Sequence, residues 1–245
     1  MSKIDYIFEG CCTSAEQAFQ ARVSGAVRVE LCSRLEVGGV TPSEELIRAS
    51  LTAVSASKNA LTKMLPNQTL LLNKLSSNDS GIKLNVLVRP RGGDFVFSEN
   101  EVKQMEEDIK MCKNIKVEDG RGGFVGVNGV VIGALLPDGR IDLATMRRLV
   151  GAARPLEVTF HRAFDECADV GKSLEDVISL GCERLLTSGH ETDAYAGRFT
   201  LAKLVRQAAG RIIILAGCGV RPHNIKEISE ASGASEFHSS TLVGW

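Results

Sequence analysis

The amino-acid sequence predicts an α/β fold, a (β/α)8 TIM-type barrel formed by a single domain over residues 1–245. Two observations predict it. Eight short apolar, β-branched runs alternate strictly with seven helix-like stretches, and a chain of 245 residues suits one barrel-sized domain. The alternation alone leaves a doubly wound open sheet as the alternative fold.

Each predicted strand is a short run rich in valine, isoleucine and leucine. The predicted strands cover residues 4–9, 26–31, 82–89, 130–135, 156–161, 184–187, 212–216 and 235–238. The predicted helices cover residues 14–23, 42–56, 98–113, 143–153, 173–180, 196–208 and 222–232. Ser98 and Glu101 form a capping-box pattern at one helix start, and Gly25, Gly181 and Gly233 stand where helices end before strands.

Two stretches exceed the repeating unit and are predicted insertions. Residues 57–81 combine a leucine-rich run with asparagine, serine and aspartate, which predicts an extension of the second helix followed by an exposed loop. Residues 114–127 are charged and then glycine-rich, ahead of the fourth predicted strand. No low-complexity linker marks a second domain.

The composition excludes several classes of protein. Lys and Arg total 29 against 30 Asp and Glu, so no basic surface for a nucleic acid or an anionic membrane is expected. The most apolar stretch, residues 122–136, is too short to span a bilayer, and the N-terminus lacks the apolar core of a signal peptide. Seven cysteines without C-x-x-C spacing favour a reducing compartment, so we expect a soluble, cytoplasmic protein.

The first two predicted strands end in the same phrase, Glu-x-Cys, at Glu9–Cys11 and Glu30–Cys32. Side chains alternate along a strand, so the glutamate and cysteine of each phrase share a face. In neighbouring parallel strands, two carboxylates and two thiols would converge at the carboxyl end of the sheet, where ligands usually bind. Thiolates suit Cu(I), with zinc a competitor, and the alternative is a pair of small buried core residues.

Further polar residues follow the other predicted strands, while the opposite ends of the same strands carry far fewer. We therefore expect one polar pocket at the carboxyl end of the barrel, although any single residue could instead form a structural ion pair, such as Glu30 with Arg89. These further candidates are Arg89, Arg91, His161, Arg162, His238 and Ser239.

A small anion is the expected ligand of this pocket. Arg89 and Arg91 share strand parity before Gly92 and Gly93, and paired guanidiniums suit carboxylates or phosphates. The glycine turn at 216–220, after the seventh predicted strand, is a weaker phosphate-binding signal that also fits a plain tight turn.

The remaining candidates are expected to complete the pocket. If the protein is an enzyme, Glu9, Glu30 or His161 would transfer protons, and Arg162, His238 and Ser239 would contact the substrate. The two histidines could equally be metal ligands or hydrogen-bonded pocket residues.

Several long motifs resemble those of the CutC family of copper homeostasis proteins, over the region from Phe8 to Ser240. The resemblance implies a cytoplasmic TIM-type barrel, usually a homo-oligomer, that binds copper through positions matching Cys11 and Cys32. The motifs lie at 30–32, 38–43, 88–95, 133–142, 158–165, 186–189 and 236–240.

Three departures from the family pattern are visible. Gly10 and Cys12 flank Cys11 where relatives usually carry other residues, and Cys218 replaces a small residue. The chain stops at Trp245 whereas relatives continue, which predicts that the last helix of the barrel is missing.

The sequence thus supports a cytoplasmic copper homeostasis protein that binds Cu(I) through Cys11 and Cys32. The alternative is a barrel enzyme acting on a small anionic substrate, such as a phosphorylated metabolite, because the pocket is more polar than a two-thiolate site requires. A barrel that serves only as an interaction scaffold is the third hypothesis.

Overall fold

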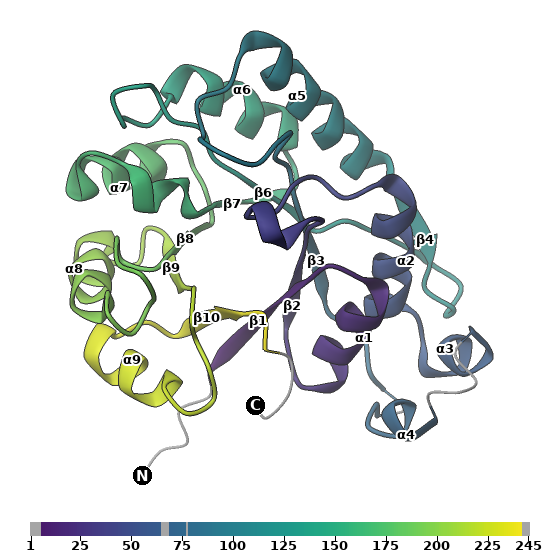
Figure 1. The fold of residues 1–245 in the computed structure, drawn as a ribbon. Helices are drawn as coiled ribbons and strands as arrows, with labels where there is room; N and C mark the ends of the chain where they lie inside the picture. Colours follow the sequence, from purple (N-terminus) through teal and green to yellow (C-terminus); the bar gives the residue numbers. More distant parts are fainter. Residues whose placement is uncertain (1–5, 65–68, 77, 242–245) are drawn as a thin grey trace.

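The computed structural model describes residues 6–64, 69–76 and 78–241, and it confirms the predicted barrel (Figure 1). Parallel strands close the barrel in the order β1-β10-β9-β8-β7-β6-β3-β2. These strands are β1 (Ile7–Cys12), β2 (Arg28–Leu31), β3 (Lys83–Leu87), β6 (Gly129–Ile132), β7 (Glu157–Phe160), β8 (Arg184–Thr187), β9 (Ile213–Ala216) and β10 (Glu236–Ser239).

Helices surround the strands, as Figure 1 shows. Their apolar faces and the outward-facing residues of the strands, such as Val29 and Leu84, form the main hydrophobic core. None of the helices in the described part of the chain combines the length and apolar character needed to cross a membrane. The helices that follow barrel strands are α1 (Ala15–Val23), α2 (Glu44–Ser55), α5 (Glu99–Asn114), α6 (Leu143–Ala153), α7 (Val170–Ser179), α8 (Arg198–Ala208) and α9 (Ile225–Ser232).

The first strand begins and ends later than the sequence predicted. Residues 4 and 5 lie outside the described residues, and β1 continues to Cys12 instead of ending at Glu9. The apolar run that signalled this strand is followed by Gly10, Cys11 and Cys12, which are small enough to extend a buried strand. Glu9 therefore lies in the middle of β1, which changes its place in the site.

The stretch 57–81 does not extend α2, contrary to the prediction. Helix α2 ends at Ser55, and two short helices follow, α3 (Lys58–Met64) and α4 (Thr69–Leu72). The break lets the leucines turn inward, where Leu61, Leu72 and Leu75 form a second small core with Phe19. Burial of these leucines, rather than helix propensity, determines the path of the chain.

The stretch 114–127 forms an antiparallel hairpin of β4 (Lys116–Glu118) and β5 (Phe124–Gly126). Its turn depends on positive φ angles at Gly120 and Gly122. Asp119 stabilises the turn by accepting hydrogen bonds from the backbone N–H groups of Arg121 and Gly123, at 2.7 and 3.0 Å.

A continuous chain of charged side chains runs through the inside of the barrel. It begins where Lys83 and Arg184 bind Glu157, with N–O distances of 2.5 and 2.7 Å. Arg184 also lies 3.4 Å from Glu236, and Arg28 binds Glu236 at 2.8 Å. We call the full set the interior ion chain: Lys83, Glu157, Arg184, Glu236, Arg28, Glu9, His238 and Glu30.

The expectation that the opposite ends of the strands carry far fewer charged residues is therefore wrong. Arg28, Glu157, Arg184 and Glu236 occupy earlier strand positions that also face the barrel interior. Because each of these charges has an opposite partner, the cost of burying it is largely offset. Arg28 is the connecting residue, since it binds both Glu9 and Glu236 while only 3% exposed.

Replacing Arg28 tests how much the fold depends on this chain. We expect Arg28→Ala to lower the free energy of unfolding by about 3–5 kcal/mol, because it leaves two buried carboxylates without their cation. Arg140→Ala, which removes an exposed ion pair with Asp138, should cost less than about 1 kcal/mol. Urea unfolding of the three proteins measures both values, and equal costs for the two variants would contradict the assigned role of Arg28.

Candidate functional site

A cavity of about 700 Å³ opens at the carboxyl ends of the barrel strands. This is the end of the barrel at which the sequence predicted a pocket, and the volume suits a small metabolite. The predicted site residues that line the cavity are Cys11, Glu30, Cys32, Arg89, His161, Arg162, His238 and Ser239. Glu9 and Arg91 are absent from this lining.

Glu9 lies deeper in the barrel than Glu30 because the two Glu-x-Cys phrases are offset by the strand register. Glu9 pairs with Arg28 in the register of β1 and β2, whereas Cys11 pairs with Glu30. The expectation that both phrases end at the same level is therefore wrong. Glu9 is only 1% exposed and belongs to the layer beneath the cavity floor.

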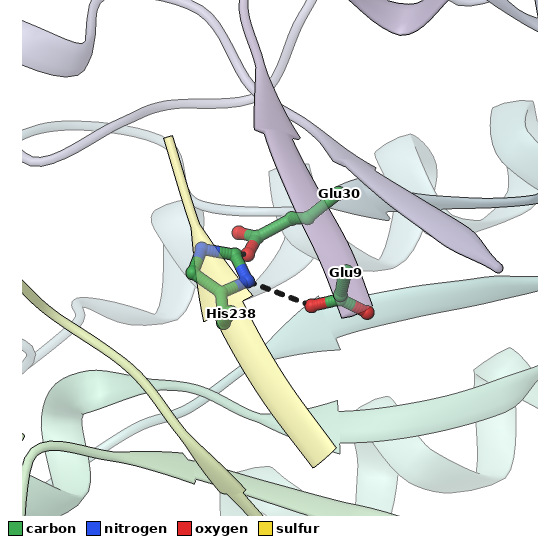
Figure 2. Close-up of side chains that lie close together, drawn as sticks. All are labelled: Glu9, Glu30 and His238. Atoms are coloured by element: carbon green, nitrogen blue, oxygen red, sulfur yellow. Dashed lines mark hydrogen bonds and ion pairs between the residues drawn. The ribbon is translucent and has the colours of Figure 1, made fainter. Parts of the chain in front are cut away.

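His238 connects the buried Glu9 to Glu30 at the cavity floor. Figure 2 shows the imidazole, carried by β10, between the two carboxylates. Its Nδ1 lies 2.8 Å from an oxygen of Glu9, and its Nε2 lies 3.4 Å from Oε2 of Glu30. The interior ion chain thus ends at the surface of the cavity.

The three groups of this trio differ in pKa. Burial opposes ionisation of Glu9, but the charge of Arg28 and the hydrogen bond with His238 lower its pKa to about 2. Burial raises the pKa of Glu30 to about 7, although His238 partly offsets it. Burial alone would lower the pKa of His238, but Glu30 and Glu9 together raise it. Near neutral pH, Glu30 is thus the member of the trio that can exchange a proton with a bound molecule.

The same trio could also be considered as a metal site, because one ligand atom from each residue lies within 4.8 Å of the others. A metal would need a lone pair on the imidazole, yet both ring nitrogens already face a carboxylate oxygen. Arg28 in addition occupies Oε2 of Glu9. The arrangement therefore suits a shared proton better than a cation.

Cys11 and Cys32 meet on one side of the cavity. Their side chains pack in one cluster, and both are free of disulfides. Leu87 and Val131 form a small apolar cluster with them. The adjacent Cys32 thiol, burial and the charge of Glu30 all raise the pKa of Cys11, so its thiol is protonated at neutral pH. Two adjacent thiols form a soft ligand pair that fits Cu(I).

The other two cysteines near the site have separate surroundings. Cys12 is fully buried in the main core, on the opposite face of β1 from Cys11. Cys218 lines the cavity away from the thiol pair, where its thiol donates to the carbonyl oxygen of Thr192 at 3.3 Å.

Arg89 lies in the cavity wall, just after β3. Its Nη1 donates to the carbonyl oxygens of Val37 and Gly39, at 3.3 and 3.2 Å. Its guanidinium carbon lies 4.4 Å from the ring centre of Phe95, and its Nε is buried without a hydrogen-bond partner. The ion pair considered between Glu30 and Arg89 does not form, since Glu30 faces His238 instead.

Arg91 does not share this wall with Arg89. Its guanidinium binds Asp94 at 2.9 Å and Glu101 at 2.6 Å. Glu101 is the capping-box residue of α5, so it holds Arg91 against the start of that helix. The predicted pairing of Arg89 and Arg91 around one anion is therefore wrong, because strand parity no longer applies in the loop after β3.

His161 lines the cavity as a neutral imidazole. Burial and the nearby charge of Arg89 lower its pKa to about 3. Its Nδ1 accepts a hydrogen bond from the backbone N–H of Ala163 at 3.2 Å, which leaves a buried Nε2 without a partner. A side chain at Gly133 would approach the ring within 2.6 Å, so glycine is needed beside it.

Arg162 and Ser239 have internal partners. Arg162 is half-exposed and forms an ion pair with Asp165 at 2.8 Å. The hydroxyl of Ser239 donates to the carbonyl oxygen of Val220 at 2.7 Å. Both residues line the cavity, but their first role is to fix neighbouring loops.

The sequence interpretation gave no role to two lining residues that shape the site. Asp165 accepts hydrogen bonds from the Thr187 hydroxyl and from the backbone N–H of Ser188, which joins the loops after β7 and β8. Arg221 lines the cavity from the segment between β9 and α9. Its position directly after the glycine turn at 216–220 was the available signal.

Comparisons with known proteins agree with this architecture. The model of the CutC family matches residues 6–68 and 56–243. A CutC family protein of Parabacteroides distasonis is 45% identical over 234 residues, which are 96% of this chain and 82% of that protein. A second one, from Xylella fastidiosa, is 44% identical and covers 93% of this chain and 72% of its own length.

Solved structures give the same result. A CutC protein of Streptococcus agalactiae, provisionally named a copper homeostasis protein, superimposes with a TM-score of 0.76 at 28% identity, over 97% of this chain and all of that one. The aldolase QR15 matches with a TM-score of 0.58 over 99% of this chain and 93% of its own, but at 12% identity this likeness shows the fold alone. The family model and the curated relatives confirm the resemblance carried by the motifs, and this chain belongs to the CutC family.

Proposed function

We propose that this protein takes part in copper homeostasis by binding one Cu(I) ion between the thiols of Cys11 and Cys32. The observation that supports this most directly is the contact between the two thiols at the cavity wall. Linear or near-linear coordination by two thiolates satisfies Cu(I), and the surrounding Leu87 and Val131 would keep water away. The name of the related Streptococcus agalactiae protein is consistent with this proposal.

Binding of Cu(I) at this pair requires loss of the thiol protons. The pKa of Cys11 is raised, so Cu(I) must displace a proton that the free protein holds at neutral pH. Affinity should therefore increase as the pH rises. Glu30 is the nearest carboxylate in register with Cys11 and can accept the released proton.

A second candidate function is proton transfer on a small anionic substrate. The observation that favours it is the Glu9–His238–Glu30 trio, which brings a carboxyl with a pKa of about 7 to the floor of a cavity that also holds Arg89 and a neutral His161. A two-thiolate copper site has no need of these groups. In this function Glu30 is the general acid or base, and the Nε2–H group of the neutral His161 is a hydrogen-bond donor to the substrate.

We further propose a cytoplasmic location and a homo-oligomeric state. The location is supported by seven cysteines that are all free thiols. The oligomer is supported by the resemblance to the family alone. The domain boundaries expected for residues 1–245, with insertions near 57–81 and 114–127, likewise stay a proposal.

Titration of the reduced protein with Cu(I) against a competing chelator tests the copper proposal. We expect one ion per chain, with Cys11→Ser and Cys32→Ser each weakening the affinity by more than about 100-fold, because each removes one of two ligands. Cys12→Ala is the matched control, since Cys12 is buried on the other face of the same strand and should leave the affinity unchanged. Unchanged affinity in both serine variants would exclude this pair.

Exchange of solvent deuterium tests the second candidate function. In deuterated water, the wild-type protein should place deuterium into at least one anionic compound of a mixed metabolite pool, as detected by mass spectrometry. Glu30→Gln should abolish this exchange, because the amide keeps the shape of the side chain but cannot take up or release the proton. Glu36→Gln, at an exposed ion pair, is the control. Exchange that persists in Glu30→Gln would overturn the assigned role.

A further inference from the structure

Two guanidinium groups in the cavity lining have no carboxylate partner. No ion pair joins Arg89 or Arg221 to an acidic side chain in the described part of the chain. The third arginine of the lining, Arg162, differs because Asp165 neutralises it at 2.8 Å. A buried or half-buried positive charge without a counter-ion favours an anionic ligand.

Hydrogen bonds and packing hold the Arg89 side chain in place without a carboxylate partner. It is 4% exposed, carbonyl oxygens of Val37, Gly39 and Gly93 accept its hydrogen bonds, and the ring of Phe95 covers one face. Carbonyl oxygens fix the orientation of the group but do not cancel its charge. The buried Nε–H has no hydrogen-bond partner, so the guanidinium also keeps an unsatisfied donor.

Arg221 is positioned by the turn that precedes α9. Its Nη1 donates to the carbonyl oxygen of Val220 at 2.7 Å and approaches the Ser239 hydroxyl at 3.4 Å. Its backbone N–H donates to the side chain of Asn224 at 2.8 Å. Within the glycine turn at 216–220, Cys218 and Gly219 have positive φ angles of 70° and 69°, which bring this backbone to the cavity edge.

The two arginines stand on opposite sides of the barrel. Arg89 follows β3 and Arg221 follows β9, and these strands are four steps apart in either direction around the closed barrel. Glu30 on β2 and His238 on β10 lie on the arc between them. A molecule that reached both arginines would therefore cross the cavity above the Glu30–His238 pair.

The other acidic residues of the lining do not oppose this arrangement. Asp165 is already occupied by Arg162 and by loop hydrogen bonds, and Glu30 faces His238. Glu166 and Glu191 are exposed at the rim, where water screens their charges.

We propose that the cavity binds a small metabolite with one anionic group at each end, one held by Arg89 and the other by Arg221, with its central carbons over Glu30 and His238. This inference rests on the second candidate function and names its substrate class. Carboxylates and phosphates both present pairs of negatively charged oxygens that a guanidinium group can bind through two hydrogen bonds. The class therefore includes dicarboxylates, phosphocarboxylates and bisphosphates.

Calorimetric titration with defined probes tests this proposal. The doubly anionic probes are glutarate, 3-phosphoglycerate and fructose 1,6-bisphosphate, and the singly anchored controls are butyrate and inorganic phosphate. We expect at least one double anion to bind the wild type more than about 10-fold tighter than either control, with the strongest of the three identifying the end groups. Arg89→Gln and Arg221→Gln should each remove that advantage.

Arg91→Gln is the matched control for these variants. Arg91 lies two residues from Arg89 but is neutralised by Asp94 and Glu101, so its loss should leave the affinity within about twofold. Arg89→Gln could disturb the loop it holds, so Arg221→Gln, checked by circular dichroism, keeps the test decisive. The proposal is overturned if no double anion binds better than the controls, or if folded Arg221→Gln binds as the wild type does.

A Glu30→Gln variant distinguishes the double-anion site from the proposed proton-transfer function. It should bind the double anion normally, since neither guanidinium contacts Glu30. Normal binding without any deuterium exchange in the wild type would refute proton transfer but leave the double-anion site standing. Deuterium exchange without selective binding of a double anion would support proton transfer and refute the double-anion site.

Discussion

The structure depends above all on Arg28, a buried cation shared between Glu9 and Glu236. Without it, two carboxylates inside the barrel would have to be protonated or solvated, either of which costs several kcal/mol. The same cation keeps Glu9 ionised, and ionised Glu9 in turn favours the protonated form of His238. The interior ion chain therefore stabilises the barrel core and also determines the charges at the cavity floor.

The cavity brings together a soft metal-ligand pair and a proton-transfer pair, and neither requires the other. The thiols of Cys11 and Cys32 offer soft ligands on an apolar wall, whereas Glu30 and His238 offer a proton on a polar floor. Both reach the same 700 Å³ space because Glu30, Cys11 and Cys32 occupy inward positions on or directly after β1 and β2, and His238 occupies one on the neighbouring β10. A copper ion at the thiols would lie beside Glu30, so occupation of one site should alter the proton affinity of the other.

The barrel was predictable from the sequence because strict alternation of strands and helices is repeated along the whole chain. The strand at 184–187 and the helix at 143–153 were placed at both ends, since clear apolar periods define them. The site was only partly predictable. Strand parity correctly grouped Cys11 with Cys32. Parity does not determine the register between strands, so the sequence prediction placed Glu9 one layer too high.

The misplaced residues share a physical reason. Arg28, Arg184 and Glu236 look like ordinary strand charges until the closed barrel shows that they face one another. Arg91 lies beyond the end of β3, where the loop and the start of α5 determine its partners. Arg221 was passed over because a single arginine after a glycine turn is a weak signal until the opposite wall of the cavity is known.

The most direct test of the interior ion chain is the protonation state of His238, measured from the ring ¹⁵N shifts of labelled protein between about pH 5 and 9. We expect the pKa of His238 to lie above the ordinary histidine value because Glu30 and Glu9 stabilise the imidazolium, and we expect Glu9→Gln to lower it. His161 in the same spectra should stay neutral across the range. A His238 pKa at or below the ordinary histidine value that Glu9→Gln leaves unchanged would contradict the central role of the interior ion chain.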